Sequence, residues 1–307
     1  MKIGIRVATV ALGVSLGACG SGGGPATTEP GGTPNPGGGP YPGFDIAVYP
    51  GDAAMRAWLR PASPYFWSGY YLMAPCHRDP TWTGKFGTLS SMGWGVTAIY
   101  VGQQDWTQIP IAPMNRAVDP ESSPNALRVA SALAVCSASL LTIEQGLAEA
   151  TDAATKMSAD GFPAQSVVFL DVEYVSQVTP ALLDYYRAWI RGVLADGRYL
   201  PGVYAAKSNA TSLYGASVEA FRAAGRTDAP PFWIASGTGF SMSSPPTAVG
   251  FDFARLWQGM FNVSQSWADV PLTIDVNVAS ARSPSAPATA TARATAQRIS
   301  ASARSAP

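Results

Sequence analysis

The chain has 307 residues, 47% hydrophobic and 13% charged, with a formal net charge of zero at pH 7. Four arginines of the C-terminal segment contribute to this balance, so acidic side chains outnumber basic ones in the rest of the mature chain, and we expect no nucleic-acid partner. With His77 as its single histidine, the chain excludes a histidine-rich metal site and a triad with a second histidine.

The N-terminus has the features of an export signal. Lys2 and Arg6 precede an apolar stretch, residues 7–16, that is too short to cross a bilayer. Leu16-Gly17-Ala18-Cys19 then resembles the lipobox of bacterial lipoproteins, which predicts a signal peptide over residues 1–18 and acylation of Cys19. One acyl chain gives only marginal membrane binding, whereas several acyl chains anchor a protein stably. We therefore expect a membrane-anchored protein of the bacterial cell envelope. An ordinary secretory signal with a chance cysteine is the alternative.

Two low-complexity segments flank a single predicted domain. Residues 19–40 consist mainly of Gly, Pro, Ser, Thr and Ala, which is typical of a flexible tether, and residues 281–307 form a similar tail without acidic side chains that we predict to be disordered. That tail contains Arg282, Arg293, Arg298 and Arg304. The remaining residues 41–280 approach the ~250 residues of one (β/α)₈ barrel.

The domain alternates short β-branched or aromatic runs with longer helical stretches, which predicts an α/β fold of βα units around a parallel sheet, a single TIM-type barrel. Eight strands are predicted: 44–48, 69–73, 96–101, 167–172, 202–205, 232–235, 254–258 and 272–276. Helices are predicted over Ile143–Ala159 and Pro180–Ala195, the second with Thr179 as its N-cap. The connections after the second and seventh strands look short or weak as helices, so we expect an irregular barrel with some helices missing.

Residues 103–138 are too long for a simple βα connection and contain several prolines. Long ordered loops of this kind are commonly functional, and a surface excursion held by Cys136 is the alternative. With Cys19 lipidated, Cys76 and Cys136 form an even pair in an oxidising compartment, which favours a disulfide over two buried thiols.

The run Val167-Val168-Phe169-Leu170 ends in Asp171-Val172-Glu173. A spacing of two residues places both carboxylates on one face of a strand, roughly 6.6 Å apart along it. Two acids at the C-terminal end of a buried strand are costly as core, but mutual repulsion and burial keep one of them protonated as a general acid. Glycoside cleavage needs such an acid and a nearby anion. Capping of the strand or cation binding is the alternative.

The surrounding motifs carry a family resemblance. Gly43-Phe44-Asp45-Ile46, Leu256-Trp257-Gln258 and Thr273-Ile274-Asp275-Val276-Asn277, with Gly202-Val203-Tyr204 and Phe232-Trp233-Ile234-Ala235 between them, resemble the family 25 lysozyme superfamily of glycoside hydrolases, closest to its glycoside-hydrolase-like bacterial branch. The resemblance covers nearly all of the domain. It implies a barrel lacking some helices and cleavage of the β-1,4 linkage of peptidoglycan.

By this resemblance Glu173 is the general acid, Asp171 assists the reacting sugar, and Asp45 and Asp275 flank the same pocket. Aromatic rings make good sugar platforms, and we predict substrate-binding roles for four further residues. These are Tyr204, Trp233, Trp257 and Gln258. No cofactor or metal is expected, the partners are cell-wall glycan and the membrane, and the protein is predicted to be a monomer.

Two departures from the family pattern leave the activity open. Alanine follows in Asp45-Ile46-Ala47 where the family has serine, and Tyr70-Tyr71-Leu72-Met73-Ala74 replaces an aromatic-His-Phe pattern. A chitinase-type barrel, which also ends its fourth strand in acids, needs two further aspartates upstream, where this chain has Phe169 and Ser166. The leading hypothesis is a glycan hydrolase, and the alternative is a non-catalytic glycan-binding or envelope-organising protein on the same barrel.

Overall fold

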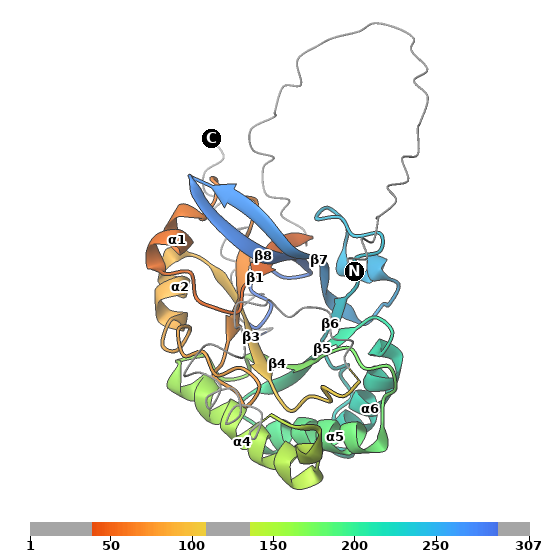
Figure 1. Ribbon diagram of the computed structural model, residues 1–307. Helices are drawn as coiled ribbons and strands as arrows, with labels where there is room; N and C mark the ends of the chain where they lie inside the picture. The colour runs from red at the N-terminus through yellow and green to blue at the C-terminus, as the bar shows by residue number, and fades with distance from the viewer. Residues whose placement is uncertain (1–38, 109–135, 288–307) are drawn as a thin grey trace, which may run out of the picture. The chain divides into compact units, whose positions relative to one another are not determined.

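The computed structural model describes residues 39–108 and 136–287 (Figure 1). The predicted signal peptide, Cys19, most of the tether, residues 109–135 of the long loop and residues 288–307 of the tail lie outside the described residues. Among the helices that are described, none combines the length and the hydropathy needed to span a bilayer.

Eight strands form a closed barrel in which each strand pairs with the next along the chain and β8 pairs with β1. All eight predicted strands are present; β4 and β6 have the predicted bounds, and the other six have shifted ends. Their bounds are β1 Tyr41–Asp45, β2 Trp67–Tyr71, β3 Gly95–Val101, β4 Val167–Val172, β5 Leu200–Ala206, β6 Phe232–Ala235, β7 Ala254–Trp267 and β8 Val270–Ala279. The predicted TIM-type α/β barrel is confirmed.

The eighth strand departs from the predicted parallel sheet. β8 runs antiparallel to both β7 and β1, whereas the other neighbouring strands are parallel. The reason is the connection, since only Ala268 and Asp269 join Trp267 to Val270. Both turn residues have positive φ, 49° and 61°, which matches the turn of a two-residue hairpin and leaves no room for a crossover helix.

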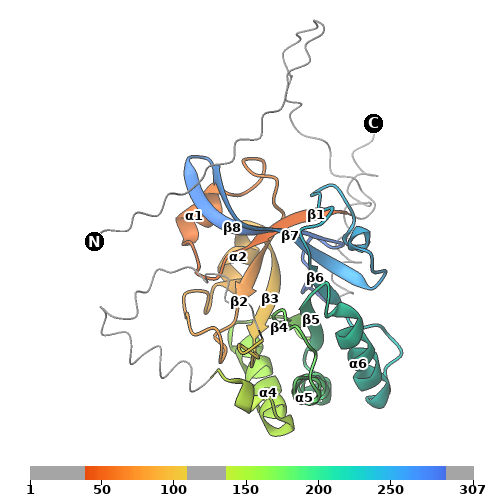
Figure 2. The same ribbon diagram turned by 45° about the vertical axis from the view of Figure 1, so that its right-hand side comes forward.

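The helices are unevenly distributed around the barrel. α4 (Ile143–Ala159), α5 (Pro180–Asp196) and α6 (Ala210–Ala223) are long and lie side by side (Figures 1 and 2). The remaining helices of the described residues are short: α1 (Asp52–Ala57), α2 (Phe86–Met92) and the 3₁₀ helices η1 (Ala138–Leu140) and η2 (Pro246–Val249). The predicted weak helix after β2 and missing helix after β7 are confirmed.

Capping and packing explain the two predicted helices. The Thr179 side chain accepts a hydrogen bond from the backbone N–H of Leu182, and Pro180 occupies the first turn of α5, which needs no N–H donor there. α4 packs closely on α5 because Gly146 has no side chain. A Cβ at this position would lie 2.4 Å from the carbonyl oxygen of Tyr185.

Alternation along the strands separates two layers of core. One face of each strand points into the barrel, where Trp67, Ile99, Phe169, Trp233 and Leu256 pack together. The opposite face meets the helices in a larger cluster. Residues two apart on a strand share a face. At the C-terminal end of each strand, the residues that share the inner face therefore also point into the barrel.

The segment after β8 belongs to the barrel. The Ser285 Oγ accepts from the backbone N–H of Ala98 at 2.8 Å, and the Ser285 carbonyl accepts from Val167 N–H at 2.8 Å. A Cβ on Gly95 would lie 1.9 Å from the carbonyl oxygen of Arg282. Residues 281–287, which the sequence analysis assigned to the disordered tail, thus hydrogen-bond to the N-terminal ends of β3 and β4.

The structure contains the predicted disulfide between Cys76 and Cys136, whose Cα atoms are 5.1 Å apart. Cys76 N–H donates to the Val101 carbonyl at the end of β3, and Trp106 Nε1–H donates to Cys136 Sγ at 2.9 Å. The bond therefore joins the C-terminal end of the long loop to the segment after β2.

We expect removal of this disulfide to destabilise the fold. The two cysteines are separated by 60 residues, and closing such a loop stabilises the native state by about 4 kcal/mol in the chain-entropy model. The Cys76→Ser/Cys136→Ser variant should therefore unfold at lower denaturant concentration than wild type without reductant. Reductant should lower the midpoint of wild type and leave that of the variant unchanged. Equal midpoints under oxidising conditions would contradict the prediction.

Candidate functional site

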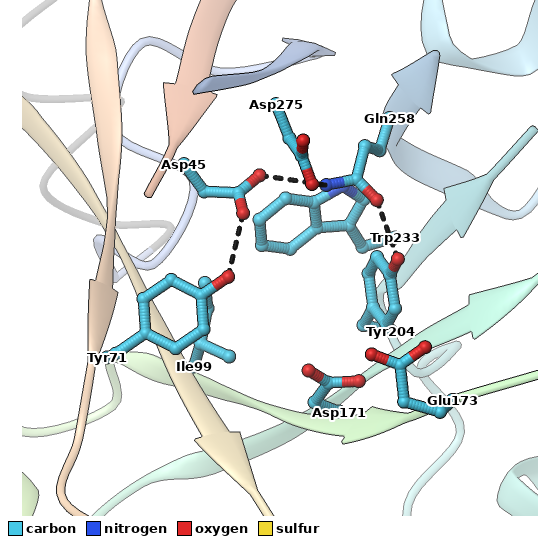
Figure 3. Close-up of a pocket in the computed structure, with 9 residues that line it drawn as sticks. All are labelled: Asp45, Tyr71, Ile99, Asp171, Glu173, Tyr204, Trp233, Gln258 and Asp275. Carbon is cyan, nitrogen blue, oxygen red and sulfur yellow. Dashed lines mark hydrogen bonds between the residues drawn. The ribbon is translucent and has the colours of Figure 1, made fainter. Parts of the chain in front are cut away.

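A pocket with an empty volume of about 320 Å³ opens at the C-terminal ends of the strands, where active sites of such barrels are found (Figure 3). Four of its lining residues are acidic, three are aromatic and none is basic. The lining residues are Asp45, Tyr71, Ile99, Asp171, Glu173, Tyr204, Trp233, Gln258 and Asp275.

Strand register brings the four acids together. Asp45 ends β1 and lies directly opposite Asp275 in the antiparallel β1–β8 pair. Asp171 and Glu173 share the inner face at the end of β4, as their spacing predicts. A glycine in β2 provides room, because a Cβ on Gly69 would lie 2.6 Å from the Cβ of Asp45. All four acids of the sequence prediction thus line one pocket.

The first half of the site is a hydrogen-bonded network around Asp45. The Gln258 side-chain amide donates to Asp45 Oδ2 at 3.0 Å and to Asp275 Oδ2 at 3.1 Å, and Gln258 Oε1 accepts from the Tyr204 hydroxyl at 2.6 Å (Figure 3). Asp45 also accepts from the Tyr71 hydroxyl at 2.7 Å and from Asn277 Nδ2 at 2.8 Å. These donors hold the Asp45 carboxylate in one orientation.

The second half of the site is the pair Asp171 and Glu173, which lie next to each other below Tyr204 in Figure 3. Asp171 is 8% exposed, and its Oδ1 is buried without a hydrogen-bond partner among the described residues. Glu173 is partly exposed, and within the same ranges its side chain accepts no side-chain hydrogen bond. The backbone N–H of Tyr174 acts on the Glu173 carboxyl group, so the unsatisfied polar atom of this pair is Asp171 Oδ1.

Burial raises the pKa values of all four carboxyl groups, and repulsion by neighbouring acids adds to the shift in three of them. Burial, then the negative charge of Asp275, raises the pKa of Asp45 to about 7, although three hydrogen bonds act in the opposite direction. Burial raises the pKa of Asp171 well above its ordinary value, with Glu173 and then Asp45 adding to it. The pKa of Glu173 is raised by burial and then by Asp275, and burial raises that of Asp275. Near neutral pH the pocket therefore retains protons on carboxyl groups.

The pair at the end of β4 is best described as sharing protons. Because Asp171 and Glu173 repel each other, loss of a proton from one makes loss from the other harder. The arrangement supplies a proton donor and an adjacent carboxylate at the same moment, which is the requirement of carboxylate acid catalysis.

Aromatic side chains form part of the pocket lining. Trp233 is buried, its indole Nε1–H donates to Asn277 Oδ1 at 3.0 Å, and Tyr204 packs edge-on against its ring at 5.4 Å between centroids. Burial raises the pKa of Tyr71 and of Tyr204 well above the ordinary value, so both hydroxyls remain protonated donors. The pocket lining thus combines acids with aromatic side chains, of which Tyr204 is partly exposed and Trp233 is almost fully buried.

Comparison with known proteins adds the family. Residues 56–279 match the model of the Rv2525c-like, glycoside hydrolase-like domain. The chain belongs to this family. The match covers most of the predicted barrel domain and confirms the glycoside hydrolase-like resemblance at the level of the family. Among curated proteins, no significant match is found.

Several solved structures are similar to this Rv2525c-like chain at low identity. An uncharacterized B. stearothermophilus protein has 18% identity and a TM-score of 0.51, over 78% of this chain and 95% of that one. A muramidase from Acremonium alcalophilum has 17% identity and a TM-score of 0.44, over 77% and 92%. The Mycobacterium tuberculosis Tat-secreted protein Rv2525c has 15% identity and a TM-score of 0.42, over 78% and 94%. At these identities the likeness concerns the fold alone.

One predicted substrate-binding residue of the Rv2525c-like domain lies elsewhere. Trp257 is fully buried on the outer face of β7, where its indole N–H donates to the Ser236 carbonyl at 2.7 Å and its ring packs edge-on against Phe240. Its neighbour Gln258 faces the pocket, and adjacent residues of a strand point to opposite sides. The prediction for Trp257 is corrected for this reason, whereas Tyr204, Trp233 and Gln258 do line the pocket.

Three residues at the site were missed as site residues by the sequence analysis. Tyr71 and Ile99 line the pocket, and Asn277 lies next to it and binds Asp45. The sequence could have predicted Asn277, because it lies two residues after Asp275 and residues two apart on a strand share a face. His77 lies against Tyr71 with ring centroids 4.9 Å apart, and burial lowers its pKa. Within residues 39–108 and 136–287, no group of His, Cys, Asp and Glu is arranged to hold a metal ion.

Proposed function

We propose that this Rv2525c-like protein is a glycoside hydrolase that cleaves the β-1,4 linkage of peptidoglycan, with Glu173 as general acid and Asp171 as the assisting carboxylate. The observation that carries the proposal is the convergence of these two carboxyl groups, which receive no side-chain hydrogen bond among the described residues, with two further acids in one pocket. Membership of a glycoside hydrolase-like family supports the same chemistry.

The reaction needs one proton and one anion from the pair. The Glu173 carboxyl group, the more exposed of the two, transfers its proton to the glycosidic oxygen as the bond to the anomeric carbon breaks and its electrons pass to that oxygen. The step requires the state of the pair in which Glu173 holds the proton and Asp171 is ionised, and the Asp171 carboxylate then stabilises the positive charge that develops on the sugar. A water molecule then attacks the anomeric carbon and returns a proton to Glu173.

The remaining acids set the conditions for this step. Burial and then the charge of Asp275 raise the pKa of Glu173, which favours the protonated form of the general acid. Asp45 and Gln258 are held by the network described above and present fixed polar atoms to the sugar hydroxyls. Tyr204 and Trp233 provide the wall against which the ring lies.

The direct test is to incubate the purified mature chain with peptidoglycan and to separate the soluble products by chromatography. New reducing ends that increase with time and with enzyme concentration support hydrolysis. A folded protein that sediments with peptidoglycan but releases no product would reject the hydrolase and favour the glycan-binding function of the same barrel.

We further propose that the protein is exported and anchored in the cell envelope through acylated Cys19, because residues 16–19 have the lipobox pattern. The Cys19→Ser variant should move from the detergent-extracted membrane fraction to the soluble exported fraction, since the acyl chains supply the membrane affinity. Cys76→Ser, which leaves the lipobox intact, should stay with the membrane. A Cys19→Ser protein that still requires detergent would contradict acylation.

A further inference from the structure

Gln104, three residues after the end of β3, makes two hydrogen bonds to the end of β4. Its side-chain Nε2 donates to the Asp171 carbonyl at 2.7 Å, and its Oε1 accepts from the Glu173 backbone N–H at 3.1 Å. The residue is 1% exposed, so water does not compete for these bonds. One side-chain amide therefore spans the backbone between the two carboxylates of the proposed catalytic pair.

This amide occupies the place of a missing strand partner. The β3–β4 ladder ends with the pair Val101 and Asp171, because β3 stops there, while β4 continues its pairing with β5 through Val172. The backbone of β4 would have unpaired polar groups on the β3 side beyond this point. In a parallel sheet, a further β3 residue would donate its N–H to the Asp171 carbonyl and accept at its C=O from the Glu173 N–H. The Gln104 side-chain amide makes both of these bonds in its place.

The two halves of the site are held in different ways. Asp45 receives three side-chain hydrogen bonds, and Asp275 receives bonds from Gln258 and from the backbone N–H of Asn262. The Asp171 and Glu173 carboxyl groups have no such side-chain donors among the described residues. Their positions depend on the backbone of β4, and the bonds that hold this backbone on the β3 side come from Gln104.

We propose that Gln104 is a positioning residue that fixes Asp171 and Glu173 relative to each other and to the sugar. The inference rests on the proposed function, since it assigns a role within the same reaction. A displacement of about 1 Å in a catalytic group can cost on the order of 10²-fold in rate, so a bond that sets the backbone of both acids has a large effect.

The neighbouring residue Gln103 makes its hydrogen bonds to other elements. Gln103 Nε2 donates to Glu149 Oε1 in α4 at 2.6 Å, its backbone N–H donates to the Tyr185 hydroxyl in α5 at 3.0 Å, and its Oε1 accepts from Ser137 N–H at 2.8 Å. Gln103 thus connects this segment to two helices and to the returning end of the long loop. Gln103 and Gln104 are both buried glutamines, but in these bonds Gln104 alone contacts β4.

This difference provides a matched pair of variants. Gln104→Met keeps the length of the side chain and removes both hydrogen bonds, and we expect kcat to fall 10- to 100-fold with KM changed less than about threefold. Gln103→Met should lower the melting temperature and keep kcat within about threefold of wild type. Gln104→Glu keeps the acceptor for Glu173 N–H, loses the donor to the Asp171 carbonyl, and should lie between wild type and Gln104→Met in kcat.

A second readout does not depend on turnover. Carbon-13 NMR titration of the Asp and Glu carboxyl groups should show the pKa values of Asp171 and Glu173 moving toward their ordinary values in Gln104→Met but not in Gln103→Met, because the pair becomes free to separate. If wild type releases no product while this shift occurs, the hydrolase function fails and the positioning role stands. The positioning role would be overturned if Gln104→Met had the same carboxyl pKa values and the same kcat as wild type. It would also be overturned if Gln104→Met and Gln103→Met lost equal amounts of kcat. Should Gln104→Met not fold, the same criteria apply to Gln104→Leu, which also lacks both hydrogen bonds and adds no charge.

Discussion

Glu173→Gln should lower kcat for peptidoglycan cleavage by about 10²–10⁴-fold and leave sugar binding nearly unchanged, because glutamine keeps the shape of the side chain but has no proton to transfer. Glu173 is the partly exposed member of the pair at the end of β4 and lines the pocket. The measurement is the rate of appearance of reducing ends at saturating substrate, together with binding of a soluble glycan fragment by calorimetry.

The matched control is Glu144→Gln. Glu144 lies exposed in the first turn of α4 and does not line the pocket, so its replacement should leave turnover and binding as in wild type. A Glu173→Gln variant that turns over as fast as wild type would overturn its assignment as the general acid. A loss of binding equal to the loss of kcat would point to a role in holding the sugar.

Asp171→Asn should have two opposite effects. Turnover should fall about 10²–10³-fold, because the variant lacks the anion that stabilises positive charge on the sugar. Stability at alkaline pH should rise, because asparagine never requires a buried charge. Asp171 Oδ1 has no hydrogen-bond partner in the described part of the chain, so at that atom the substitution removes no intramolecular bond.

The sign of the pH effect follows from the direction of the pKa shift. Burial raises the pKa of Asp171 above its unfolded value of 3.8, so its stabilising contribution is full below that value and is lost as pH rises through the folded pKa. The melting temperature of Asp171→Asn relative to wild type should therefore increase from pH 4 to pH 8. Asp184→Asn, at an exposed position of α5, should show no such trend. A difference that stays constant with pH would contradict a raised pKa.

These two variants separate the chemistry of the pocket from its architecture. The same four acids that destabilise the pocket when ionised are those that supply protons and charge to a substrate. If Asp171→Asn loses activity and gains stability at alkaline pH, then Asp171 contributes to turnover at a cost in stability. A gain in stability without any wild-type turnover would fit a pocket that binds glycan without cleaving it.

Much of the barrel could be predicted because its signals are local. Alternation between β-branched runs and helical stretches identified the eight strands, and Thr179 with Pro180 identified the start of α5, since a cap and a proline act within one turn. The shared face of Asp171 and Glu173 follows from the geometry of any strand. These features depend on neighbours a few residues apart.

The direction of β8 and the inner face of β7 were decided by the closed barrel. A two-residue hairpin reverses β8, and its pairing with β1 brings Asp275 opposite Asp45. The register of the closed sheet turns Gln258 inward and Trp257 outward, although the two are equally plausible sugar ligands by residue type. A strand pattern specifies alternation, but which of the two faces meets the interior depends on how distant strands pair.

The sequence by itself determined the strand and helix segments, the candidate acid pair and the cysteine pair, because each depends on residue type and short spacing. Through the family resemblance the sequence also predicted that four acids share one pocket. Only the tertiary structure decided that no basic side chain of the described residues lines that pocket, and that Gln104 spans the backbone of the reactive pair. The physical reason is that these features arise from interactions between residues far apart in the sequence. Burial, charge repulsion and the loss of a strand partner are properties of groups that the chain brings together from residues 45 to 275, and no local pattern encodes them.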